Sequence, residues 1–237
     1  VLTRHLTKVQ YNFKGEHIGR QDIGICPIAG LGKKKNNLNR TVLWMIGAAK
    51  SHLFICTPYF NPPKQILQQL EAALHSGVKI TLLVGDKTAN DFFIQPEEQF
   101  SAIGVIPYIY EQNLRSFIQK HLEYLQSGQL EVMLWKDENN SFHVKGIFVD
   151  QSYALITGNN LNPRAWGLDL ENGLVISDPS HLLQEKFMHE QLYLLKHAKK
   201  ISELSQIQDF DEYPEEVKKL LSRVKILRAS LIIRHLL

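Results

Sequence analysis

A histidine, a lysine and an aspartate stand in this chain at a spacing that could serve phosphoryl chemistry. His143 and Lys145 are two positions apart, and Asp150 follows them. Asn160 comes ten positions after Asp150. The run from Phe142 to Asp150 is predicted to be a strand, and side chains two positions apart on a strand point to the same face. We therefore expect the imidazole of His143 and the ammonium of Lys145 to lie side by side.

This pairing suits the transfer of a phosphoryl group. The histidine could attack phosphorus or move a proton, while Lys145 and the Asn160 amide donate hydrogen bonds to the anionic oxygens. That chemistry requires neither a metal ion nor a cofactor. The alternative is an ordinary strand with a half-buried histidine and a solvated lysine. Chance gives His-x-Lys-x4-Asp on the order of 1% of the time in such a chain, and Asn160 lowers that frequency further, so we favour the catalytic interpretation.

Asp150 is the least secure member of this group. It stands at an odd offset from His143, so on a straight strand the two side chains face opposite ways. We keep Asp150 as a candidate catalytic residue but expect it to close the turn to Tyr153 rather than to transfer a proton.

The elements that must position these residues follow an α/β pattern. Gly24–Ile28, Leu53–Thr57 and Val78–Gly85 are short apolar runs typical of buried strands. Between the last two lies Lys64–Ser76, whose apolar residues have helical spacing, and Gly77 can cap its C-terminus. Such a βαβ unit implies parallel pairing with a right-handed crossover.

The rest of the chain continues this alternation of helices and strands. Strands are predicted at Leu130–Trp135, Tyr153–Thr157 and Glu171–Ser177, and helices at Leu114–Gln126, His181–Lys200 and Glu215–Leu237. We expect an α/β fold in which residues 1–180 form the catalytic domain and residues 181–237 form a C-terminal helical extension with a basic tail.

The composition is that of a soluble globular protein. The chain has 237 residues, 44% hydrophobic and 22% charged. No stretch approaches the roughly 20 apolar residues of a membrane span, the N-terminus lacks the pattern of a signal peptide, and the missing initiator methionine suggests a fragment. Cys26 and Cys56 stand in apolar segments and are expected to be reduced core residues of a cytoplasmic protein. The net charge of +3 is too small to indicate nucleic-acid binding.

The segment around His143 resembles the signature of the phospholipase D superfamily, His-x-Lys-x4-Asp-x6-Gly-Ser-x-Asn. The resemblance implies a mixed sheet flanked by helices. This chain departs from the signature at Thr157 and Gly158, which stand where Gly-Ser is usual; Thr157 could supply the missing hydroxyl to a phosphate. The family also uses a downstream carboxylate to orient the histidine, and Glu171 is the matching position.

A narrower resemblance covers most of the chain. TPYFNP at Thr57–Pro62 and TGNNLNPRAW at Thr157–Trp166 are similar to the C-terminal half of the phosphatidylserine synthase family of Gram-negative bacteria. Tyr59 and Asn162 lie in these segments and are candidates for substrate contact, because loops after strand ends line the site of an open α/β sheet. Packing alone could also explain Tyr59.

The resemblance implies a reaction of CDP-diacylglycerol with L-serine that gives phosphatidylserine and CMP through a phosphatidyl-histidine intermediate. Enzymes of that family contain two motifs that meet at one site, and this chain contains one; the N-terminal half would supply the other. His143 would then act as the acid toward CMP and as the base toward the serine hydroxyl. The alternatives are another enzyme of the superfamily, cardiolipin synthase-like or a homodimeric phosphodiesterase, and a vestigial module that binds lipid or ribosomes. The oligomeric state is not indicated.

The tail Val217–Leu237 carries six cations and no acidic residue. One apolar stripe runs along the predicted helix: Val217, Leu220, Leu221, Val224, Leu227 and Leu231. This pattern suits a helix that lies on an anionic membrane surface, and it equally suits a helix packed on the protein's own core. We expect a cytoplasmic protein that associates peripherally with the inner membrane.

Overall fold

Eight strands form one mixed sheet in the part of the chain that the structure, a computed structural model, describes, namely residue 19 and residues 21–226. The strands are β1 (Gly24–Leu31), β2 (His52–Thr57), β3 (Lys79–Gly85), β4 (Leu130–Trp135), β5 (Gly146–Val149), β6 (Tyr153–Thr157), β7 (Leu170–Ser177) and β8 (Ala198–Ile201). Their order across the sheet is β1-β7-β6-β5-β2-β3-β4-β8.

Parallel and antiparallel pairing both occur. The pairs β2–β3 and β3–β4 are parallel, and the other neighbours are antiparallel. Helix α3 (Lys64–His75) connects β2 to β3, which confirms the predicted βαβ unit. Both strands are buried on two faces, as their continuous apolar sequences indicate.

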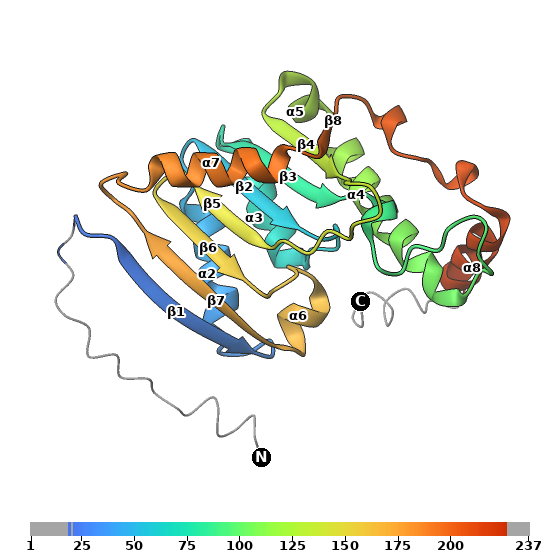
Figure 1. Cartoon of the computed structure of the whole chain (residues 1–237), viewed down its shortest axis with the longest axis horizontal. Helices are drawn as coiled ribbons and strands as arrows, with labels where there is room; N and C mark the ends of the chain where they lie inside the picture. The colour runs from blue at the N-terminus through green and yellow to red at the C-terminus, as the bar shows by residue number, and fades with distance from the viewer. Residues whose placement is uncertain (1–18, 20, 227–237) are drawn as a thin grey trace, which may run out of the picture.

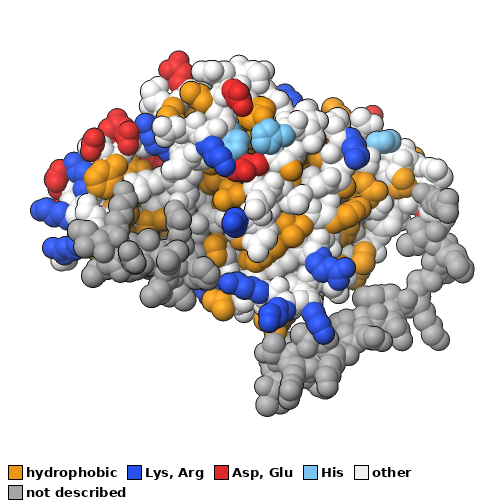
Figure 2. All heavy atoms as spheres, turned by 180° about the vertical axis from the view of Figure 1, so that it is seen from behind, with side chains coloured by type: hydrophobic (Ala, Val, Ile, Leu, Met, Phe, Trp, Pro, Cys, Tyr) orange, Lys and Arg blue, Asp and Glu red, His pale blue; other side chains and the backbone are white. Residues whose placement is uncertain are grey.

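Helices cover both faces of the sheet. The helices of the described chain besides α3 are α2 (Asn37–Ala48), α4 (Ile106–Lys120), α5 (Leu122–Ser127), α6 (Pro163–Gly167), α7 (Gln184–Leu195) and α8 (Glu215–Ile226), with short 3-10 turns η1 (Lys87–Ala89), η2 (Ala102–Val105), η3 (Leu204–Gln206) and η4 (Phe210–Glu212). Figure 1 shows α7 across one face and α2 and α3 behind the other. Figure 2 shows the α2 and α3 side, where lysines and arginines lie among hydrophobic side chains.

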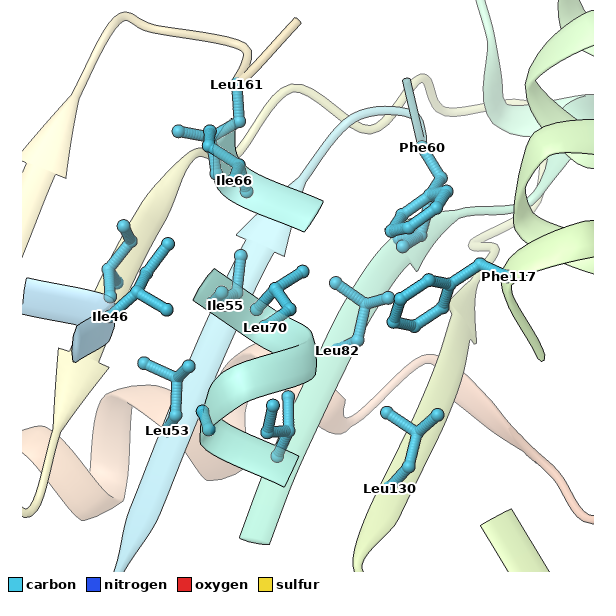
Figure 3. Packing of buried hydrophobic residues seen from close by; sticks show 14 of the residues in the cluster. Ile46, Leu53, Ile55, Phe60, Ile66, Leu70, Leu82, Phe117, Leu130 and Leu161 are labelled. Carbon is cyan, nitrogen blue, oxygen red and sulfur yellow. The ribbon is translucent and has the colours of Figure 1, made fainter. Parts of the chain in front are cut away.

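Alternate residues of the central strands enter two separate cores. Leu53 and Ile55 of β2 pack with the cluster beneath α2, α3 and α4, as Figure 3 shows. Phe54 and Cys56 point the other way and pack with Phe187 of α7. This two-sided burial holds the strand ends, and therefore the loops that follow them, in a defined position.

The structure corrects several predicted elements. The strand expected from Phe142 begins only at Gly146, because Gly146 is the first residue to pair with β2, at Cys56. Helix α2 was not predicted; Asn36 caps it. The helix expected at Leu114–Gln126 is two helices, α4 and α5, that meet at His121.

The C-terminal region also differs from a purely helical extension. The helix expected at His181–Lys200 ends at Leu195, and β8 then pairs with the otherwise exposed edge of β4, burying Ile201. Val217 and Leu221 of α8 pack against Tyr213. The core-packing alternative therefore holds for these two positions, while the stripe from Val224 onward lies outside the described side chains.

The two cysteines are placed differently. Cys56 is buried as predicted, and burial raises its pKa to about 12. Cys26 is exposed, so its prediction as a core residue was wrong. Its strand, β1, is the edge of the sheet, and three consecutive residues there, Ile25, Cys26 and Pro27, are exposed. The described helices include none long and apolar enough to cross a membrane.

Candidate active site

Most of the predicted site residues lie at one edge of the sheet. Strands β2, β3 and β6 end there, at Thr57, Gly85 and Thr157, and the antiparallel strands β5 and β7 begin there. In open α/β sheets, ligands bind in the crevice beyond the strand ends, where loops supply polar groups. The sequence prediction of a shared site is therefore consistent with the topology.

His143 lies just before β5 and forms an ion-pair contact that the sequence did not predict. Its Nε2 atom lies 2.8 Å from Oδ2 of Asp91, and both side chains are about half exposed. The Phe142 amide donates a hydrogen bond to the Ala89 carbonyl at 3.0 Å, which joins the two segments. Asp91 is therefore held beside the imidazole by backbone structure as well as by this side-chain contact.

The loop that carries Asp91 is itself well anchored. Asp86 accepts hydrogen bonds from the amide and hydroxyl of Thr88, and Lys136 donates to the Thr88 carbonyl at 3.0 Å. A hydrogen bond from Ser141 lowers the pKa of Asp91; burial opposes this, and His143 and Lys145 lower the pKa further. Asp91 is thus held as an anion beside the histidine.

Lys145 and Glu171 form the second charged group of the site. The Lys145 ammonium donates to the His143 carbonyl at 2.7 Å. Burial lowers the pKa of Lys145, and the nearby carboxylates of Glu171 and Asp91 oppose that shift. Burial and Asp169 raise the pKa of Glu171, against the effect of Lys145. Glu171 thus lies in electrostatic range of the lysine, whereas the ion pair described for His143 is with Asp91 rather than with the expected Glu171.

The turn after β6 carries the candidates Gly158 and Asn160. Thr57 donates its hydroxyl to the Asn160 carbonyl at 2.8 Å, and Asn160 Oδ1 is buried without a hydrogen-bond partner among the described residues. The Gly158 amide donates to the Asn172 carbonyl at 3.2 Å. The buried Asn160 oxygen can only accept a hydrogen bond, so the partner that it lacks is a donor.

Thr157 does not have the role that the sequence suggested. Its hydroxyl donates to the Asn172 carbonyl at 2.5 Å and accepts from the Asn159 amide at 3.1 Å. The side chain is buried, and its hydrogen bonds stabilise the end of the β6–β7 pairing. Thr157 is therefore a structural residue in this arrangement and not the substitute for the missing phosphate-binding serine.

Tyr59 and Asn162 join the two loops of the narrower resemblance. Asn162 Nδ2 donates to the Tyr59 hydroxyl at 3.4 Å, and Asn162 Oδ1 caps α6 by accepting from the Ala165 amide at 2.8 Å. The Tyr59 ring stacks on Tyr110 with centroids 4.3 Å apart. These contacts explain both side chains structurally, and their contact with substrate stays a prediction.

Asp150 lies at the opposite end of β5 from His143 and is not part of the site. Its carboxylate accepts hydrogen bonds from the backbone amides of Lys50, Ser51 and His52 at 2.7–2.9 Å. Burial would raise the pKa of Asp150, but these hydrogen bonds outweigh burial and lower the pKa. The structural role expected from the sequence is thus supported, with β2 rather than Tyr153 as the partner.

Replacing Asp150 with alanine should lower the free energy of unfolding by at least about 2 kcal/mol, since charged hydrogen bonds are lost. The residue also has φ of +50°, which alanine adopts less readily than asparagine, so Asp150→Asn should lose less. Because the folded-state pKa is lowered, this stabilisation is present above the ordinary value of 3.8 and is lost as pH falls through the folded-state pKa. Urea denaturation of both variants and of the unmodified protein, at neutral and acidic pH, measures these effects. An Asp150→Ala variant as stable as the unmodified protein at neutral pH would contradict the prediction.

Comparison with known proteins identifies the family. A family model described as "Cardiolipin synthase, PLD-like domain" matches residues 42–192. The chain belongs to the PLD-like domain family. It is 41% identical over all 237 residues to the CDP-diacylglycerol–serine O-phosphatidyltransferase of Escherichia coli, covering 100% of this chain and 52% of the relative.

Two further comparisons place this PLD-like chain. The crystal structure of phosphatidylserine synthase from Haemophilus influenzae superimposes with a TM-score of 0.95 at 39% identity, covering 99% of this chain and 52% of that chain. Cardiolipin synthase A of Buchnera aphidicola is 28% identical over 152 residues, which are 63% of this chain and 26% of that protein. The chain spans about half the length of the phosphatidyltransferases that it matches.

The contact between Asp91 and His143 yields a prediction for this PLD-like site. Asp91→Asn should lower kcat for the reaction catalysed at the site by about 10²-fold, because a misplaced catalytic group costs that much. Glu171→Gln is the matched change at the carboxylate that the sequence analysis expected to orient the histidine. It should lower the rate only through its loss of charge near Lys145. Steady-state kinetics of the two variants compares them. A near-normal rate in Asp91→Asn beside a large loss in Glu171→Gln would return the orienting role to Glu171.

Proposed function

We propose that this chain supplies one half of the active site of a CDP-diacylglycerol–serine O-phosphatidyltransferase. The observation that carries the proposal is the contact of the Lys145 ammonium with the His143 carbonyl, at a sheet edge whose fold matches a phosphatidylserine synthase over 99% of the chain. The higher identity to the serine transferase than to cardiolipin synthase A favours serine as the acceptor.

The proposed reaction has two displacements at phosphorus. A histidine of the other half-site attacks the phosphatidyl phosphorus of CDP-diacylglycerol, the bond to CMP breaks, and His143 donates a proton to the departing CMP oxygen. The serine hydroxyl then attacks the phosphatidyl-histidine, His143 removes its proton, and the phosphorus–nitrogen bond breaks. His143 thus returns to its starting protonation state.

The other charged groups support these two steps. Lys145 and Asn160 donate hydrogen bonds to the non-bridging oxygens, where negative charge develops in each transition state. Asp91, at 2.8 Å from the imidazole, orients His143 and stabilises its cation. Each role depends on a side chain at the same sheet edge.

A second half-site completes the proposal. The sequence contains one His-x-Lys-x4-Asp motif; its nearest other candidate, His197 with Lys199, lacks the aspartate because Leu204 stands in its place. His197 is also held by an ion pair to Asp137 at 3.2 Å. We infer that a further part of the same protein supplies the attacking histidine.

An acceptor assay tests the proposed reaction. The purified protein that contains this chain is supplied with CDP-diacylglycerol, and CMP release is compared with L-serine, glycerol phosphate and water as acceptors. The proposal predicts that serine gives the highest rate and that phosphatidylserine accumulates in equal amount with CMP. A preference for a phospholipid or glycerol phosphate acceptor would favour a cardiolipin synthase-like enzyme, and no CMP release would reject the proposal.

We further propose that the protein meets its lipid substrate as a peripheral protein of the cytoplasmic face of the inner membrane. Lys219 and Arg223 are exposed on α8, whereas Lys218 pairs with Glu215 at 2.6 Å. A cation near an anionic surface contributes about 1 kcal/mol to binding. The exposed pair is therefore suited to anionic lipid while Val217 and Leu221 pack inward.

Reversing both charges, Lys219→Glu and Arg223→Glu, should weaken binding to anionic vesicles by on the order of 10-fold and leave binding to neutral vesicles little changed. Lys196→Glu and Lys199→Glu, two exposed lysines beyond α7, form the matched control. Vesicle sedimentation measures the binding. Equal loss in both double variants would assign the effect to net charge rather than to α8.

A further inference from the structure

A large groove lies near the site, on the side of the sheet that α2 and α3 cover. Its volume is about 740 Å³, within the range of small-molecule sites. Its walls come from the loop after β2, from α3 and α4, and from α6. Figure 2 shows the side of the molecule that carries α3.

The side chains that line the groove are largely apolar, and three of the lining residues are lysines. Hydrophobic side chains line the groove: Phe60, Pro62, Pro63, Leu67, Phe117 and Trp166. Lys33, Lys64 and Lys120 also line it. Lys120 pairs with Glu71 at 2.6 Å, whereas the ion pairs of the described residues include neither Lys33 nor Lys64. An apolar surface with uncompensated positive charges matches an amphiphile with long hydrocarbon chains and polar oxygens.

Two loops connect the groove to the site along the chain. The chain passes from Tyr59 into the groove at Phe60, and from Asn162 into the groove at Pro163. The hydrogen bond from Asn162 to the Tyr59 hydroxyl at 3.4 Å holds these loops together where the groove begins. The wall of the groove and the candidate site thus share these two loops.

We propose that this groove binds the diacylglycerol part of the phosphatidyl donor. The proposal rests on the proposed function, because that donor places two acyl chains next to the reacting phosphorus. The acyl methylenes lie on Leu67, Phe117 and Trp166, and Lys33 and Lys64 donate hydrogen bonds to the ester carbonyl oxygens. Each methylene that the groove buries strengthens binding by about fourfold.

Donors of different chain length test the groove in the full-length protein. Leu67→Trp fills the groove, and Leu192→Trp, at a leucine 66% exposed on α7, is the matched control. Leu67→Trp should raise KM for a donor with 16-carbon chains by at least about 10-fold and raise KM for a donor with 4-carbon chains much less, while Leu192→Trp changes neither. Equal changes for the two donors in Leu67→Trp would overturn the proposal.

Cross-linking gives a readout that does not depend on turnover. A phosphatidic acid with a diazirine in one acyl chain is irradiated with the full-length protein, and the labelled peptides are mapped. Labels are expected within residues 60–71, 113–120 or 163–167, decreased by Leu67→Trp and not by Leu192→Trp. Labels confined to other segments would overturn the groove as an acyl site. Labelled groove peptides in a protein that releases no CMP would retain the groove and reject the proposed reaction.

Discussion

Replacing His143 with alanine in the protein that contains this chain should lower CMP release from CDP-diacylglycerol by on the order of 10³- to 10⁴-fold. A positioned acid–base group contributes up to that much, and His143 would serve in both displacements. Its side chain is 57% exposed and pairs with Asp91 at its surface, so its removal leaves the core intact. CMP release under saturating serine measures the loss, and the unfolding midpoint should stay near that of the unmodified protein.

His197 offers a matched control for this change. It is also a partly exposed histidine in contact with an aspartate, Asp137. It lies before β8 at the same end of the sheet, two strands beyond β3 and outside the His-x-Lys-x4-Asp motif. His197→Ala should keep CMP release close to normal. A purified, folded His143→Ala protein with near-normal activity would refute the assignment of the site.

Replacing Lys145 with methionine should lower kcat by about 100-fold or more, equivalent to about 2.7 kcal/mol of barrier. Methionine keeps most of the length of the side chain but loses the ammonium that would neutralise the phosphoryl oxygens. Lys145→Arg should recover part of the rate, since it keeps the charge with a different geometry. Steady-state kinetics with CDP-diacylglycerol and serine measures both variants.

Lys199→Met is the matched control for the lysine, because Lys199 stands two positions after His197 as Lys145 stands after His143. Lys199 is exposed on β8, and its loss should leave kcat nearly unchanged. A loss of less than about 3-fold in Lys145→Met would show that the ammonium does not act on the transition state.

Most of the sheet could be predicted from the sequence because its strands are strongly apolar. The runs of β2 and β3 have two buried faces, and the helical spacing of α3 between them is clear. Helix α2 was missed because Asn, Arg and Thr interrupt its apolar pattern, yet Asn36 caps it and Leu38, Val42 and Met45 are fully buried. Helix α2 is therefore stabilised by tertiary packing that its sequence pattern does not reveal.

The site was predictable in its motif and less so in its partners. The Lys145 ammonium contacts the His143 backbone carbonyl on the segment before β5 rather than on a strand, so the side-by-side placement of the two side chains stays a prediction. Asp91 belongs to no motif, and its contact with His143 depends on how the loop after β3 folds back, which spacing does not encode. A search for carboxylates just beyond predicted strand ends would have been the available signal.

Thr157 is a residue whose role the sequence predicted wrongly. Its hydroxyl was a reasonable substitute for a missing serine, but a hydroxyl has only one hydrogen to donate. The Asn172 carbonyl accepts hydrogen bonds from both the Gly158 amide and the Thr157 hydroxyl. The competition between a strand's own hydrogen bonds and a ligand's is visible only when both partners are located.

The passage of the phosphatidyl group through a histidine is the central claim, and exchange of CMP tests it most directly. Labelled CMP and unlabelled CDP-diacylglycerol are incubated with the protein that contains this chain, without serine, and label in the lipid is measured. A phosphatidyl-histidine intermediate predicts that label enters CDP-diacylglycerol in the absence of serine and that His143→Ala abolishes this exchange. Efficient transfer to serine by a protein that shows no exchange would contradict the account.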